Sequence, residues 1–165
     1  MLKDYFCEEE YEIVKKSDNI LFKALEVVNR VFKDSVDKGG IPYSVHLLRV
    51  YGDVSDYTEK VCALLHDIVE DTKVSYDDLK DIGFNDEIID IIKILTKLKG
   101  EDYQKYIDRI IESKNIHAYN IKIADLSHNM ELGRIKNPTA NDYERINKRY
   151  LPAQARLLIA LEEME

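Results

Sequence analysis

Apolar residues recur at helical spacing along most of this chain, and the strict alternation expected of a β-strand is rare. A clear example lies between residues 19 and 38, where the apolar positions follow a period close to 3.6. These positions are Leu21, Leu25, Val28, Val31 and Phe32. The run Gly39-Gly40-Ile41-Pro42 then predicts the end of that helix. The same spacing continues further along the chain, so the pattern favours an all-α protein.

Helix start and stop signals divide the rest of the chain. Further helices are predicted over about 43–51, 55–72, 75–83, 85–95, 102–113, 116–130 and from 139 onward. Ser75 with Asp78 forms a capping box and Gly83 a stop signal, while Pro152 predicts a kink or a new helix. No repeat or Pro/Gly-rich linker interrupts the series. We therefore expect residues 1–165 to form one compact helical bundle of roughly eight helices.

Composition and charge narrow the range of functions. Hydrophobic residues make up 45% and charged residues 34% of the 165, and the formal net charge is −8. Long nucleic acids need a basic surface, so they are not expected as partners. No apolar run reaches the roughly 18 residues of a membrane span, and the acidic start MLKDYFCEEEYE lacks a signal-peptide core. Two cysteines without a disulfide pattern favour a reducing, cytoplasmic setting.

The segment Val61–Val74, VCALLHDIVEDTKV, combines a core-like apolar run with four ionisable groups. On an α-helix His66, Asp67, Glu70 and Asp71 would occupy an arc of about 140° beside the apolar positions. A carboxylate at the edge of a core without a partner costs several kcal/mol, so a positive group is expected nearby. The alternative is that the whole arc is simply solvated.

Two further segments make a metal site the stronger interpretation. GGIPYSVHLLRV contains His46, and NIKIADLSHNMEL contains Asp125 and His128. Imidazole and carboxylate ligands suit a divalent cation such as Mn²⁺, Fe²⁺ or Zn²⁺. His46 and Asp125, together with His66 and Asp67, would supply two imidazoles and two carboxylates, although no local spacing shows that these side chains meet.

In these three segments the chain resembles the HD-domain phosphohydrolases, and more closely the small (p)ppGpp hydrolase branch of the RelA/SpoT family. The resemblance covers residues 32–158. It rests on DKGGIPYSVHLLRV, LLHDIVEDT and IKIADLSHNM, in that order. The resemblance implies an HD-type helical bundle with a bound divalent metal, for which we favour Mn²⁺.

The resemblance also implies roles for individual residues. The implied metal ligands are His46, His66, Asp67 and Asp125. Glu70 and Asp71 are expected to position and deprotonate the attacking water. Candidate substrate contacts are Lys38, Tyr43, Lys122, Asn129 and Arg134, with Tyr43 either stacking on a base or bracing the metal helix. Arg134 would replace a family arginine at the position of Glu131. Apart from the resemblance, Lys97 is expected to be solvated. Arg145 and Arg149, four apart on one helical face, could clamp phosphate but are expected on the surface.

The implied reaction is attack of metal-activated water on a guanosine polyphosphate, with release of pyrophosphate from its 3′ position. A chain that ends at Glu165 leaves no room for a synthetase domain, so we expect a small nucleotide substrate and hydrolysis alone. Two alternatives remain open from the sequence. One is a 5′-nucleotidase-like HD phosphohydrolase that releases phosphate. The other is a non-catalytic nucleotide sensor.

Overall fold

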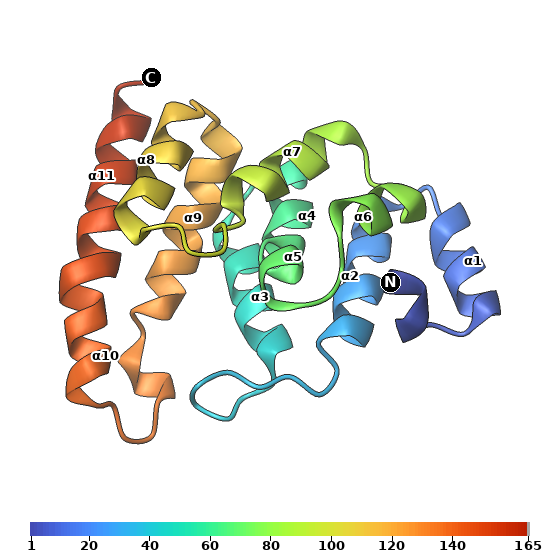
Figure 1. The fold of residues 1–165 in the computed structure, drawn as a ribbon, viewed down its shortest axis with the longest axis horizontal. Helices are drawn as coiled ribbons and strands as arrows, with labels where there is room; N and C mark the ends of the chain where they lie inside the picture. Colours follow the sequence, from blue (N-terminus) through green and yellow to red (C-terminus); the bar gives the residue numbers. More distant parts are fainter. Residues whose placement is uncertain (165) are drawn as a thin grey trace.

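The computed structural model describes residues 1–164 and has the predicted all-α architecture (Figure 1). The helices are α1 (Glu8–Lys16), α2 (Ile20–Val31), α3 (Tyr43–Asp53), α4 (Tyr57–Leu65), α5 (Ile68–Asp71), α6 (Tyr76–Ile82), α7 (Asp86–Leu95), α8 (Tyr103–Glu112), α9 (Ile116–Asn129), α10 (Ala140–Arg145) and α11 (Leu151–Glu162). Within residues 1–164 the only β pairing is one isolated bridge between Val36 and Pro42. None of the described helices has both the length and the apolar character needed to cross a bilayer.

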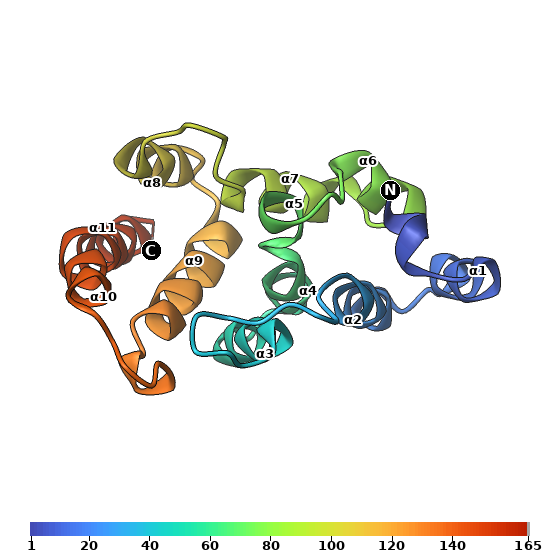
Figure 2. The same ribbon diagram turned by 60° about the horizontal axis from the view of Figure 1, so that its bottom comes forward.

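Helix α4 forms the centre of the bundle. It packs against α2, α3, α7 and α9, and its last five residues, Val61 to Leu65, are fully buried. Each large aliphatic side chain buried in this way contributes about 1.5–3 kcal/mol. Helices α1 and α11 lie at opposite ends of the molecule in both views (Figures 1 and 2). The adjacent pair His66 and Asp67 therefore follows directly after this buried helix, and the hydrophobic core around α4 fixes the position of the pair.

The helix predicted over 55–72 is shorter than expected and is interrupted. It starts at Tyr57, because the Asp56 carboxylate accepts hydrogen bonds from the backbone N–H groups of Thr58 and Glu59 and makes Asp56 the cap. It ends at Leu65, and α5 begins at Ile68. Asp67 adopts φ −98° and ψ −4°, the sparsely populated bridge region in which active-site residues often lie. The predicted arc of about 140° on one continuous helix is therefore wrong for the four ionisable groups of this segment, because the helix is broken at His66 and Asp67.

The helix predicted over 19–38 ends earlier, at Val31. The helical spacing of apolar residues stops after Phe32, so additional helical turns would have no apolar face to pack against the core. The chain instead turns back on itself, and the backbone N–H groups of Asp37 and Tyr43 donate to the carbonyls of Ile41 and Ser35. This turn, residues 35–43, is referred to below as the Asp37 turn.

Other sequence signals are confirmed. Ser75 and Asp78 form the expected capping box of α6, and Gly83 ends that helix with φ +103°, a conformation that favours glycine. Near Pro152 the chain forms a π-helical turn, Ile146–Tyr150, that leads directly into α11. The N-terminal elements, a 3₁₀ turn at Leu2–Tyr5 and helix α1, were not predicted from the sequence.

Candidate metal centre

Three separate parts of the fold bring the predicted metal ligands together. His46 lies on α3, His66 and Asp67 form the junction of α4 and α5, and Asp125 lies on α9. Ligand atoms of His46, His66 and Asp125 lie within 4.8 Å of one another. Asp67 is not in that group of three, but its Oδ2 lies 3.0 Å from Nε2 of His66 and 3.4 Å from Nε2 of His46. The four side chains therefore do meet in the fold, although their spacing in the sequence did not show this.

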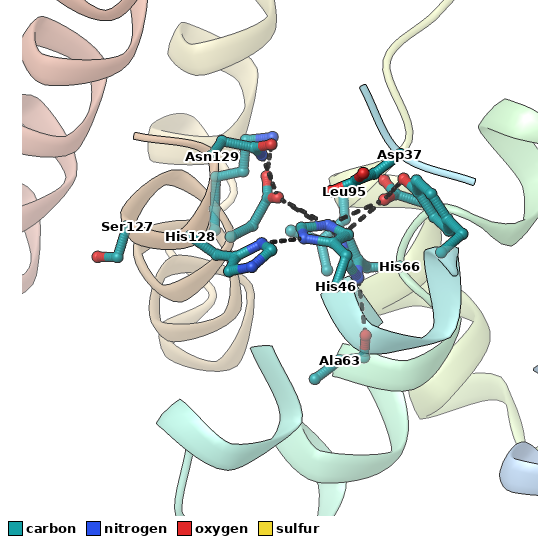
Figure 3. A network of polar contacts seen from close by, with 12 residues as sticks. Asp37, His46, Ala63, His66, Leu95, Ser127, His128 and Asn129 are labelled. Carbon is teal, nitrogen blue, oxygen red and sulfur yellow. Dashed lines mark hydrogen bonds and ion pairs between the residues drawn. The ribbon is translucent and has the colours of Figure 1, made fainter. Parts of the chain in front are cut away.

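The orientation of His66 suits a metal ligand. Its Nδ1 lies 2.7 Å from the carbonyl oxygen of Ala63, which can only accept, so Nδ1 carries the hydrogen (Figure 3). In the neutral ring this leaves the lone pair on Nε2, which is buried and has no hydrogen-bond partner. Buried polar atoms are nearly always paired. An unpaired imidazole nitrogen facing two carboxylates fits a site for a divalent cation.

The buried groups interact strongly with one another. Burial by itself would raise the pKa of Asp125, but Lys122 and the two imidazoles hold it well below its usual value. Burial would lower the pKa of His66, yet Asp67 and Asp125 raise it well above its usual value. His66 is 3% exposed, so the solvated alternative is wrong for this residue. Glu70 and Asp71, in contrast, reach solvent.

Asp125 is held by two residues that the sequence analysis assigned to the substrate. The ammonium group of Lys122 donates to Oδ2 of Asp125 at 2.8 Å, and the side-chain amide of Asn129 donates to Oδ1 at 2.5 Å. Both lie on α9, three and four residues from Asp125, on the same helical face. Their observed contacts orient the carboxylate, and substrate binding by either residue stays a prediction.

The acid pair lies beside the centre. Glu70 accepts a hydrogen bond of 2.8 Å from the backbone N–H of Lys97. Asp71 accepts one of 3.2 Å from the hydroxyl of Tyr43. Although both side chains reach solvent, partial loss of water raises the pKa of each, and the nearby Asp67 charge raises it further. Raised pKa values suit carboxylates that accept a proton.

Tyr43 braces the centre. Its ring stacks on Phe32 with the ring centroids 4.9 Å apart. Its hydroxyl donates to Oδ2 of Asp67 at 2.5 Å and also contacts Asp71. Of the two roles considered from the sequence, these contacts favour bracing over stacking on a base.

Arg134 is bound to the Asp37 turn. Its guanidinium forms an ion pair of 2.5 Å with Asp37, and the two side chains are only 13% and 9% exposed. The other oxygen of Asp37 accepts from the backbone N–H groups of Gly39 and Ile41. A β-carbon on Gly39 would lie 2.4 Å from the Arg134 carbonyl oxygen, so the turn and the segment after α9 are in close contact. Arg134 thus links two segments, while Lys38 on the same turn is exposed.

Breaking this buried ion pair should be costly. Arg134→Gln leaves the Asp37 carboxylate buried without its partner, and we expect the free energy of unfolding to fall by about 3 kcal/mol. Adding Asp37→Asn removes the charge but keeps the turn acceptor, and should restore at least half of the loss. Urea denaturation measures both. The control is Lys148→Gln, which breaks the exposed pair with Glu144 and should cost under about 1 kcal/mol. Equal losses for Arg134→Gln and the control would contradict this interpretation.

Two cavities adjoin the centre and share four lining residues, Tyr43, His46, Asn129 and Tyr150. The first, of about 240 Å³, is also lined by Lys38, Arg134 and Arg145. The second, of about 190 Å³, is also lined by Asp67, Glu70, Lys97, Lys122 and Asp125. Each cavity therefore combines access to the centre with cationic side chains.

The cavities also involve residues that were not expected at a site. Lys97 and Arg145, which were expected on the surface, are half-buried, and each lines a cavity beside the centre. Tyr150 was not singled out, although it lines both. Tyr150 lies four residues after Ile146 in the π-helical turn, and both side chains line the first cavity. Pro152 predicted a change in the helix near this point, but it did not indicate that Tyr150 would face the cavities.

No family model matches the chain. Comparison with curated proteins instead finds relatives whose names refer to guanosine polyphosphate synthesis or hydrolysis. A probable GTP pyrophosphokinase of Mycobacterium leprae is 31% identical over 137 residues, 75% of this chain and 17% of that protein. A probable guanosine-3′,5′-bis(diphosphate) 3′-pyrophosphohydrolase of Mycoplasma pneumoniae is 30% identical over 152 residues, 88% of this chain and 20% of that protein. The chain therefore spans about a fifth of the length of these curated relatives.

A solved structure supports the same relationship at the level of the fold. It belongs to a metazoan ortholog of SpoT, described as hydrolysing ppGpp. The match has a TM-score of 0.64 at 22% identity and covers 90% of this chain and 94% of that one.

A helical bundle that brings an adjacent His-Asp pair to a second histidine and a second aspartate has the architecture of an HD-type domain. The relatives narrow this class. The chain is related in sequence and similar in fold to proteins of the RelA/SpoT family.

Proposed function

We propose that this chain is a metal-dependent nucleotide phosphohydrolase that removes pyrophosphate from the 3′ position of guanosine-3′,5′-bis(diphosphate). The observation that carries the proposal is the convergence of His46, His66, Asp67 and Asp125 at the meeting point of two cation-lined cavities. The names of the relatives support the substrate.

The shape of the site suits a ligand with phosphates at both ends. Lys97 and Lys122 line the cavity that also contains Glu70, so the diphosphate to be cleaved would lie there. Lys38 and Arg145 line the other cavity, which would accept the nucleoside and its 5′-diphosphate. Two separate groups of cations favour a bis(diphosphate) over a nucleotide with a single phosphate group.

The residues of this chain then perform defined tasks. His46, His66, Asp67 and Asp125 would hold the metal, and Mn²⁺ is the ion we propose. A bound divalent cation neutralises phosphate charge and makes water more acidic. Glu70, held by the Lys97 N–H, accepts the proton of the attacking water, and Asp71 orients it. The water oxygen bonds to phosphorus and the bond to the 3′ oxygen breaks. The 3′ oxygen takes up the proton that Glu70 accepted from the water, and pyrophosphate leaves.

A panel of nucleotides tests the proposal. The Mn²⁺-loaded protein is incubated separately with guanosine-3′,5′-bis(diphosphate), GTP, GMP and AMP, and phosphate and pyrophosphate are measured. We expect pyrophosphate and GDP from the first compound. Release of phosphate from the monophosphates, without pyrophosphate from the first, would instead support the 5′-nucleotidase-like alternative. A thermal shift without product would support the sensor. Either result would overturn the proposal.

Loss of the Tyr43 hydroxyl should slow this reaction. Tyr43→Phe keeps the ring on Phe32 but removes the hydrogen bonds to Asp67 and Asp71, and we expect kcat to fall about tenfold. Tyr51→Phe, on the same helix, is the control and should leave kcat unchanged. If Tyr43→Phe matched the wild type, the bracing role would be wrong.

A further inference from the structure

The two buried histidines His46 and His128 form a hydrogen bond that the proposed reaction does not use. Their Nδ1 atoms lie 2.7 Å apart, and the side chains are 5% and 6% exposed (Figure 3). Their rings are 4.9 Å apart at an interplanar angle of 32°. At this distance one Nδ1 must carry a hydrogen and the other must accept it.

The rest of the site determines which ring donates. Nε2 of His46 faces the centre, 3.3 Å from Oδ1 of Asp125 and 3.4 Å from Oδ2 of Asp67. A neutral imidazole binds a metal through the nitrogen that has no hydrogen. If Nε2 of His46 binds the metal, its hydrogen must be on Nδ1. Nδ1 of His128 is then the acceptor, and its own hydrogen is on Nε2.

The two histidine ligands would thus be oriented by the same device. Nδ1–H of His66 donates to the carbonyl of Ala63, in the helix that directly precedes it. Nδ1–H of His46 donates instead to a side chain on α9, 82 positions away. His128 lies three residues after Asp125, so α9 supplies both a ligand and the group that orients a second ligand from α3.

We propose that His128 is a positioning residue whose Nδ1 accepts the hydrogen of His46 and holds the lone pair of His46 Nε2 toward the metal. The inference rests on the proposed metal centre. It goes beyond the proposed function because it assigns the hydrogen on each ring and makes metal affinity depend on a residue that is not a ligand. Acceptors that orient ligating histidines typically change metal affinity by about 10–100-fold when they are removed.

Two substitutions separate this role from simple packing. His128→Leu fills much of the same space but offers no acceptor, while the amide oxygen of His128→Asn lies close to the position of Nδ1. We expect His128→Leu to weaken Mn²⁺ binding about 10–100-fold, measured by isothermal titration calorimetry, and His128→Asn to recover most of that loss. His117→Leu is the control. It removes the other histidine of α9, which contacts Glu59, and should leave Mn²⁺ affinity unchanged.

The outcomes distinguish this inference from the proposed function. If the wild type binds no Mn²⁺, the metal centre itself is wrong. If the wild type binds and His128→Leu binds equally well, only the positioning role is wrong. Nitrogen-15 spectra of the wild type loaded with Zn²⁺ provide a test that needs no variant to fold. We expect hydrogen on Nδ1 of His46 and on Nε2 of His128, and the reverse arrangement would overturn the inference.

Discussion

Asp67→Asn is expected to remove the metal-dependent activity almost completely. The substitution preserves the size of the side chain but removes a charge that lies 3.0 Å from Nε2 of His66 and 3.4 Å from Nε2 of His46. A divalent cation supplies several kcal/mol of transition-state stabilisation, so we expect turnover to fall by at least about a thousandfold. Metal affinity should fall as well, which calorimetry with Mn²⁺ measures directly.

A matched control isolates the effect of position. Asp77→Asn makes the same chemical change on an exposed residue of α6, away from the two cavities. It should leave both Mn²⁺ affinity and turnover unchanged. Thermal unfolding of both variants shows whether the fold is retained. An Asp67→Asn variant that keeps wild-type metal content and turnover would contradict the assigned ligand set.

Substitutions of Glu70 and Asp71 should differ from Asp67→Asn, because turnover should be lost while the metal stays bound. Glu70→Gln and Asp71→Asn keep the shape of each side chain but remove its ability to accept a proton. General base catalysis contributes about 10²–10⁴-fold, so we expect kcat to fall within that range while Mn²⁺ affinity stays near the wild-type value. Wild-type kcat in Glu70→Gln, with metal bound, would remove Glu70 from the reaction.

The pH profile gives an independent measure of the same group. Partial burial and the Asp67 charge raise the pKa of Glu70 above its ordinary value. The deprotonated form is the active one, so kcat should be full above the raised pKa and fall as the pH drops through it. The acidic limb should therefore lie at a higher pH than for an ordinary glutamate. Glu70→Gln should abolish this limb in the residual activity, and an unchanged limb would assign it to another group.

The helices and the chemistry of the site could be predicted because both are encoded locally. Ser75, Gly83 and the spacing of apolar residues define helix ends and faces within a few positions. Likewise His66 and Asp67 are neighbours, and their apolar flanks indicate burial. The early end of α2 was missed although the apolar spacing stops at Phe32, and the break between α4 and α5 was missed because neither glycine nor proline marks it.

The contacts of the candidate substrate residues could not be predicted because they join distant parts of the chain. Arg134 pairs with Asp37, 97 positions earlier, and Tyr43 bonds to Asp67, 24 positions later. Nothing in the spacing of either pair indicates contact. The N-terminus is a similar case, because Leu2 is buried where its N–H donates to Asp78. Arg134 and Tyr43, which were predicted to contact the substrate, thus form hydrogen bonds to other residues of the protein.

The central claim is that residues from three separate segments hold one divalent cation. Anomalous scattering at the manganese edge, recorded from crystals of the Mn²⁺-loaded protein, tests it most directly. We predict a single strong peak bonded to His46, His66, Asp67 and Asp125. No peak at this position, with the four side chains turned away from one another, would contradict the account.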